Sequence, residues 1–183
     1  DAAGAYMDQD QDGQGRERND DIYTAQIVEV MDPDLAAAVR QALGLAADAT
    51  VGEQELARLT SLTLDSNVID TLEGLQYATG LTTLVVTPDD ASSPGHLNGI
   101  GQLSGLANLT TLVLRGTGLT DAELATASTL ANLTSLDLTY NDIDVLPTWI
   151  ANLPKLASLS LYGNPLEYLS EYDPRHALTA LKG

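Results

Sequence analysis

The chain has 183 residues, of which 26 are Asp or Glu and 8 are Lys or Arg, so its formal net charge is -18. A surface this acidic repels nucleic acid and anionic lipid, and neither is an expected partner. The sequence contains no cysteine, which excludes disulfides, thiolate metal sites and cysteine nucleophiles. No apolar run approaches the ~18 residues of a membrane helix, so membrane insertion is not expected.

Residues 1–21 form a polar segment in which acidic residues alternate along the chain. The pattern D-x-D-x-D-G matches the first half of a calcium loop, because alternate carboxylates converge on one hard cation. The segment resembles the calcium loops of dockerin halves and thrombospondin-type repeats, which implies a bound calcium ion. A standard twelve-residue loop would close at Asn19, which is not acidic, so an acidic tail or linker stays open as the alternative. The candidate calcium ligands are Asp8, Asp10, Asp12, Gln14 through its backbone carbonyl, and Asp20.

Residues 22–58 are expected to form a strand and two helices. The β-branched run 22–31 predicts a short strand. Asp32 and Pro33 are typical of a helix start and Gly44 of a helix end. Thr50, with Glu53 three residues later, predicts a second helix that begins with a capping box. We expect these helices to cover one end of the repeats that follow.

Residues 59–166 repeat one phrase, L-x-x-L-x-L, which begins at 59, 81, 109, 133 and 156. The starts lie 22, 28, 24 and 23 residues apart, and several copies continue with x-x-N-x-L. This period and spacing predict an α/β leucine-rich repeat solenoid of about five repeats with a parallel sheet on its concave face. The second copy is over length and predicts a surface loop, and residues 167–183 predict a short helical cap.

The recurring polar residues of the repeats have a structural explanation. An asparagine at the bend can donate and accept hydrogen bonds to backbone groups that leave the sheet, which explains Asn67, Asn141 and Asn164. Threonines recur at 60, 82, 110 and 134, at the strand margin, where threonine is a good β-former. Trp149 is expected to cover an edge of the core. These residues are therefore assigned to the fold.

The stretch from about residue 30 to residue 166 resembles the bacterial, internalin-like group of leucine-rich repeat proteins. The residues that carry the resemblance are the cap helix beginning Asp32-Pro-Asp-Leu and the repeat 59–78. The resemblance implies a secreted or cell-surface bacterial protein that binds or adheres to a partner. It implies no particular recognition residues, since these vary within the group, and the irregular repeat length departs from the regular 22 of internalins.

The outward strand positions are the best candidate surface for binding. They are mostly small and hydroxylated, Thr139 in the fourth copy among them, with a few larger exceptions. Asp137 is expected to pair with Arg115 across neighbouring strands. Tyrosine and arginine are frequent anchors of protein interfaces. The candidate ligand-binding residues are Val85, Val113, Arg115, Asp137, Tyr140 and Tyr162.

No catalytic motif is present, and the two histidines, His96 and His176, have no spaced partners. The chain is therefore expected to be no enzyme but a recognition or adhesion module for a protein or glycan. The alternative is a structural spacer of a larger extracellular protein, which calcium would stiffen at its N-terminal junction.

Overall fold

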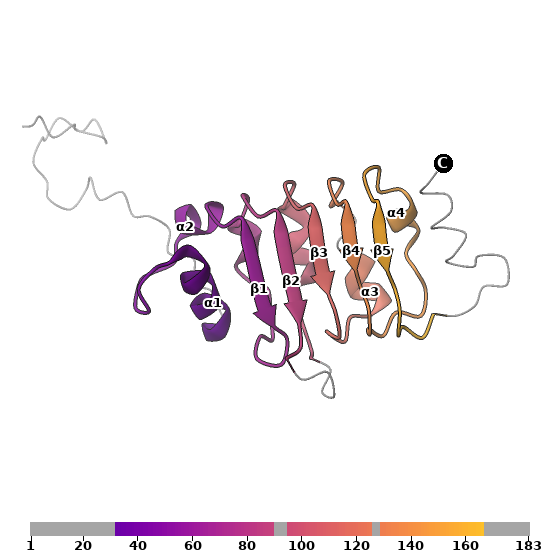
Figure 1. Cartoon of the computed structure of the whole chain (residues 1–183), viewed down its shortest axis with the longest axis horizontal. Coiled ribbons are helices and arrows are strands. Elements are labelled where there is room, and N and C mark those ends of the chain that lie inside the picture. Colours follow the sequence, from indigo (N-terminus) through magenta and orange to yellow (C-terminus); the bar gives the residue numbers. More distant parts are fainter. Residues whose placement is uncertain (1–31, 90–94, 126–128, 167–183) are drawn as a thin grey trace, which may run out of the picture.

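A computed structural model describes residues 32–89, 95–125 and 129–166, and these form a solenoid with one parallel sheet (Figure 1). The sheet order is β1-β2-β3-β4-β5, so each repeat adds one strand beside the last. The return segments carry short helices behind the sheet (Figure 1). The strands are β1 (Ser61–Asp65), β2 (Thr83–Thr87), β3 (Thr111–Leu114), β4 (Ser135–Asp137) and β5 (Ser158–Ser160). The return helices are η1 (Leu75–Tyr77), η2 (Ile100–Gly105), α3 (Asp121–Leu124) and α4 (Thr148–Ala151).

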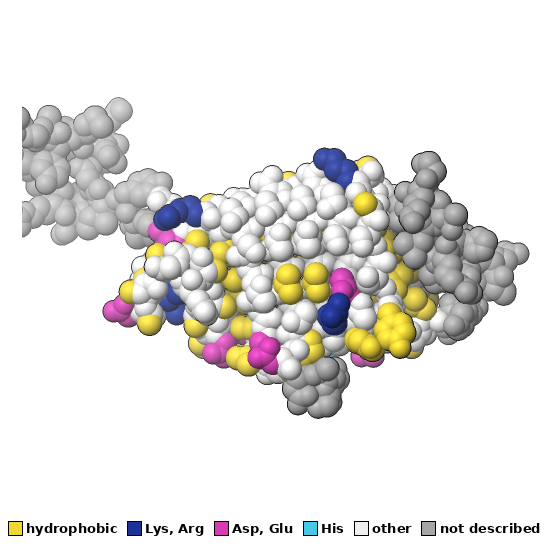
Figure 2. Space-filling view, in the orientation of Figure 1, with side chains coloured by type: hydrophobic (Ala, Val, Ile, Leu, Met, Phe, Trp, Pro, Cys, Tyr) yellow, Lys and Arg dark blue, Asp and Glu magenta, His cyan; other side chains and the backbone are white. Residues whose placement is uncertain are grey.

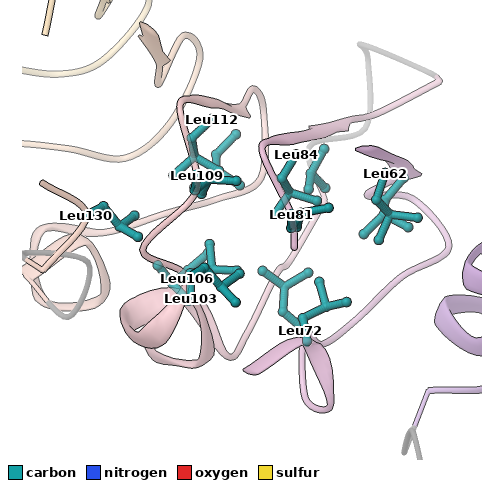
Figure 3. Packing of buried hydrophobic residues seen from close by; sticks show 14 of the residues in the cluster. Leu62, Leu72, Leu81, Leu84, Leu103, Leu106, Leu109, Leu112 and Leu130 are labelled. Carbon is teal, nitrogen blue, oxygen red and sulfur yellow. The ribbon is translucent and has the colours of Figure 1, made fainter. Parts of the chain in front are cut away.

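The core fills the space between the sheet and the return segments. In each strand the leucine-phrase residues point inward and alternate with exposed or half-exposed positions, as in the pattern of β1 and β2. Figure 3 shows Leu84 and Leu112, from neighbouring strands, above Leu72 and Leu103 of the return segments. These four side chains are at most 1% exposed. The predicted leucine-rich repeat solenoid is therefore confirmed.

Two helices cover the sheet beside β1. Helix α1 (Pro33–Leu43) begins where predicted, because the Asp32 carboxylate accepts from the Asp34 and Leu35 N–H groups at 2.8 and 2.9 Å. It ends at Gly44, whose φ of 67° is left-handed. Leu35 and Val39 are fully buried in the same cluster as the repeat leucines. The predicted cap for this end of the solenoid is thus present.

The second helix, α2 (Glu53–Ala57), begins later than predicted. The cap is Gly52, whose N–H donates to Glu55 Oε2 at 3.0 Å, and the predicted box between Thr50 and Glu53 is wrong. Gly52 is extended, and the preceding Val51 is buried at 5% exposure. Burial of Val51 therefore outweighs the local capping signal of Thr50.

The bends after the strands confirm two of the three predicted asparagines. Asn141 is 4% exposed, and its Oδ1 accepts from the N–H groups of Thr117 and Leu119. Its Nδ2 donates to the carbonyls of Leu114 and Leu138 at 2.6 and 2.9 Å. Asn164 likewise accepts from the Ile143 N–H and donates to Leu138 and Leu161 carbonyls.

Asn67 occupies the corresponding position of the first repeat but is exposed. Its own N–H donates to Asp65 Oδ1 at 2.9 Å, and the same oxygen accepts from the Asp89 N–H at 3.0 Å. The neighbouring Ser66 is buried, because the backbone of Gly95 returns against it from the over-long second copy. The irregular copy thus changes how the first bend packs.

At the edge where the strands begin, the recurring threonines bond from repeat to repeat. The hydroxyls of Thr82, Thr110 and Thr134 donate to the carbonyls of Thr60, Thr82 and Thr110 at 2.9, 3.1 and 3.0 Å. We call Thr60, Thr82, Thr110 and Thr134 the threonine ladder. Asn108 and Asn132 add a second series, donating to the carbonyls of Thr79 and Ala107. These threonines therefore do more than favour extended backbone.

Three predictions fall outside the described residues: the calcium loop within 1–21, the strand 22–31 and the C-terminal cap 167–183. Within the described residues, none of the helices has the length and apolar character needed to cross a membrane. Trp149 packs against the core from α4, as predicted.

Candidate binding surface

The exposed face of the sheet consists of rows in which each strand supplies one side chain. The parallel register sets Ser61, Thr83, Thr111, Ser135 and Ser158 in one row. The next row holds Thr63, Val85, Val113, Asp137 and Ser160. Because the strands are parallel, their C-terminal ends meet at one edge, and the larger side chains that follow the strands gather there.

Val85 and Val113 are direct register partners on β2 and β3. Both lie on the outward side of the sheet and are partly exposed. Val113 is in turn the register partner of Asp137 on β4. The structure therefore brings three of the six predicted binding residues together in one row.

Arg115 and Asp137 form the predicted ion pair, with 2.7 Å between Arg115 Nη2 and Asp137 Oδ2. The Arg115 side chain is 49% exposed and that of Asp137 is 16% exposed. Asp137 also accepts from the N–H of Thr139 at 3.0 Å and from the Thr139 hydroxyl. Partial burial alone would raise the pKa of Asp137, but the Thr139 and Arg115 hydrogen bonds outweigh it and lower the pKa.

Thr139 was expected to face outward with its strand and is instead 7% exposed. It lies beyond the end of β4, where the chain has begun to bend, and its hydroxyl turns back to the Asp137 carboxylate. The prediction of an outward Thr139 is therefore wrong, and this residue holds Asp137 in place from below the surface.

Tyr140 and Tyr162 contact each other edge to face, with ring centroids 5.4 Å apart and an interplanar angle of 83°. They are 55% and 74% exposed, which is unusual for residues of this size. The Tyr140 N–H donates to the Tyr162 carbonyl at 2.8 Å, so the backbone also joins the two residues.

The position of the Tyr140 ring depends on glycine at 163. A Cβ atom added to Gly163 would lie 2.3 Å from Tyr140 Cδ1, so the ring lies directly against the glycine backbone. Gly163 has a φ of +78°, and Tyr140 itself has a φ of 59°. Both residues therefore have left-handed conformations, which only glycine adopts at no cost. No pattern in the sequence predicted this contact.

Figure 2 shows how these groups share one face of the molecule. A small hydrophobic area lies at the middle of the sheet, beside one acidic and one basic group, and a larger hydrophobic area lies toward the last strands (Figure 2). Most of the remaining face is neither charged nor hydrophobic (Figure 2). We call Val85, Val113, Arg115, Asp137, Tyr140 and Tyr162 together the sheet-face cluster.

The predicted metal ligands Asp8, Asp10, Asp12, Gln14 and Asp20 lie outside the described residues. In the part that is described, no group of three or more histidine or acidic side chains could hold a metal ion. Sequence reasoning missed two exposed acids that follow Tyr140, namely Asp142 and Asp144. Their position between the bend asparagine and the return segment was readable from the repeat alignment.

Three comparisons place the fold among known proteins. A family model described as leucine rich repeat matches residues 107–166. Chaoptin of Tribolium castaneum is 35% identical over 122 residues, which cover 63% of this chain and 14% of chaoptin. The crystal structure of an internalin (inlF) from Listeria monocytogenes superposes with a TM-score of 0.64 at 28% identity, covering 82% of this chain and 41% of the internalin chain.

The chain thus spans 41% or less of either relative's length. The internalin likeness extends over most of this chain, whereas the family model covers its last three strands. Together with the five parallel strands, these matches show that the chain has a leucine-rich repeat fold similar to that of the internalin.

Proposed function

We propose that this chain is a non-catalytic recognition module that binds a protein through the sheet-face cluster. The observation that carries the proposal is the exposed, mutually fixed pair Tyr140 and Tyr162 beside the Arg115–Asp137 ion pair. Burial of exposed aromatic rings on association removes apolar surface from water, and rings already fixed in place lose little entropy on binding. The internalin-like fold supports recognition as the role of the repeats.

The composition of the rest of the exposed face also supports this proposal, because it differs from that of the sheet-face cluster. Its outward positions on β1 and β5 are serine, threonine or aspartate, which offer little apolar area. Interface energy is usually concentrated in a few aromatic and arginine residues surrounded by near-neutral contacts. The distribution on this sheet has that form, with the large residues toward the C-terminal end of the solenoid.

The proposal can be tested by panning a displayed random-peptide library against the full chain. We expect convergent peptides that bind the wild type and lose about tenfold or more in affinity with Tyr140→Ala or Tyr162→Ala. The matched control is Val68→Ala, which truncates a side chain that is 50% exposed after β1. No convergent peptides, or peptides that bind both tyrosine variants as well as the wild type, would overturn the proposal.

A parallel glycan array decides between a protein and a glycan ligand. If no peptide is selected and the chain binds a glycan that Tyr162→Ala no longer binds, the ligand is a carbohydrate. We further propose that the protein is secreted or displayed on a cell surface, with the internalin-like fold as support. Fractionation of the source cells tests that location.

A second candidate function is a spacer role in which calcium stiffens the N-terminal junction. It is favoured by the D-x-D-x-D-G pattern that begins at Asp8. Calorimetry with calcium and then with a chelator should show a binding heat that Asp10→Ala removes. No heat in the wild type would sink this candidate and leave the recognition proposal untouched.

A further inference from the structure

The charges within the sheet-face cluster indicate which charge its partner has. The only ion pair among the described residues joins Arg115 to Asp137, so the one cation of the cluster is already neutralised at 2.7 Å. A partner carboxylate or phosphate would have to compete with Asp137 for that guanidinium. The cluster therefore has no free positive charge to offer an anionic partner.

Unlike Arg115, the two acidic residues that follow Tyr140 have no partner of opposite charge among the described residues. Asp142 and Asp144 are exposed, and neither carboxylate forms an ion pair within the described residues. The bend that carries them is fixed, since the Asp144 and Val145 N–H groups donate to Asp121 Oδ1 at 3.0 and 3.2 Å. In Figure 2 an acidic group borders the larger hydrophobic area near the last strands.

The tyrosine pair adds a second feature that favours a cation. A ring face attracts an ammonium or guanidinium group placed within about 6 Å of its centroid. Tyr162 is 74% exposed and Tyr140 is held by Gly163, so at least part of both rings is open to a partner side chain. The overall charge of -18 would also steer a cationic partner toward the domain.

We propose that the protein segment bound at Tyr140 and Tyr162 is cationic, with an arginine or lysine side chain that stacks on the rings and faces Asp142 and Asp144. This inference rests on the proposed function and specifies the chemistry of the partner. An uncharged, proline-rich segment is the competing occupant, because it would also pack on two tyrosines. The two occupants differ in their dependence on charge, and that difference can be measured.

The probe is a short peptide of alternating arginine and glycine, with a control peptide in which citrulline replaces each arginine. Citrulline keeps the shape and removes the charge. In an NMR titration of the full chain, we expect the arginine peptide to shift the signals of Tyr140, Tyr162 and Asp142. We expect the citrulline peptide to bind about tenfold more weakly, the factor that a partly exposed cation–π contact supplies.

Variants separate this site from general attraction to an acidic protein. Tyr140→Ala with Tyr162→Ala should weaken the arginine peptide about tenfold, and Asp142→Asn with Asp144→Asn about threefold. The matched control Asp48→Asn with Glu73→Gln removes two exposed acids near the first repeat and should leave affinity unchanged. Equal binding of the citrulline peptide, or binding that survives loss of both tyrosines, would overturn the inference.

The panning experiment keeps the two proposals separable. If it selects peptides that need Tyr162 but are neutral or acidic, the recognition function stands and the cationic partner is wrong. If it selects nothing and the arginine peptide does not bind either, both proposals fail.

Discussion

At the edge where the strands begin, threonine and asparagine side chains bond to the neighbouring repeat, whereas at the edge where the strands end, two tyrosines remain more than half exposed. The first edge repeats its residue types, and its polar groups are used within the fold. The second edge carries the recurring bend asparagines Asn141 and Asn164, but also Arg115, Tyr140 and Tyr162, each of which occurs at its repeat position in one copy only. In this molecule the recurring residues hold the solenoid together, and the residues that depart from the repeat are the ones that we propose to bind a partner.

The largest expected effect tests the structural half of this comparison at the bend. Asn141→Ala should lower the free energy of unfolding by about 4 kcal/mol, because it leaves several buried backbone groups without partners at roughly 1–3 kcal/mol each. The matched control is Asn108→Ala, which removes an exposed amide whose Nδ2 donates to the Thr79 carbonyl at 2.8 Å and should cost less than about 1 kcal/mol. Urea unfolding measures both. Equal losses would show that burial of the asparagine does not determine its contribution.

The next effect concerns the Arg115–Asp137 ion pair at the edge where the strands end. Asp137→Asn should cost about 0.5–1 kcal/mol near neutral pH, a modest value because the Arg115 partner is 49% exposed and solvent screens the pair. The pKa of Asp137 is lowered from 3.8. The stabilisation is therefore present above pH 3.8 and is lost as pH falls through the lower folded-state pKa.

Unfolding of the wild type and Asp137→Asn at about pH 6 and about pH 2 checks this sign. The difference between the two proteins should shrink at the lower pH. A difference that stays constant would mean that the shape of the side chain, and not its charge, stabilises this edge.

The features that could be predicted from the sequence follow the division between recurring residues and residues that occur once. The leucine spacing predicted the five strands of the described residues and the leucines of their core, because the sheet period of two and the repeat period leave one register. The Arg115–Asp137 pair was predictable because both positions continue the outward alternation of neighbouring repeats, with Asp137 at the end of β4 and Arg115 directly after β3. The start of α2 was not, since burial of Val51 outweighed the Thr50 capping signal, a tertiary effect that local sequence does not contain.

The tyrosine pair has features of the site that could not be predicted from the sequence. Sequence indicated that Tyr140 and Tyr162 were large and near the end of the repeats. It could not indicate that Tyr140 takes a left-handed φ or that its ring lies against Gly163. These features depend on the contact between two adjacent bends, and no single-repeat pattern specifies them.

A smaller effect tests the edge where the strands begin. Thr110→Val removes a hydroxyl that donates to the Thr82 carbonyl at 3.1 Å and should cost about 0.5 kcal/mol. The cost is small because the N–H groups of Thr110 and Thr111 also donate to that carbonyl, which keeps partners in the variant. A loss well above about 1 kcal/mol would show that the threonine ladder acts cooperatively along the solenoid.

The smallest expected effect on stability is also the sharpest test of the comparison. Tyr162→Ala should change the free energy of unfolding by no more than about 0.5 kcal/mol, since the side chain is 74% exposed and contributes little to the core. The same substitution should weaken binding of the peptides selected by panning about tenfold or more. If Tyr162→Ala instead destabilises the domain by about 2 kcal/mol, the exposed ring is a structural brace for Tyr140. The tyrosines would then serve the fold like the recurring residues, and the binding site would have to be sought on another face.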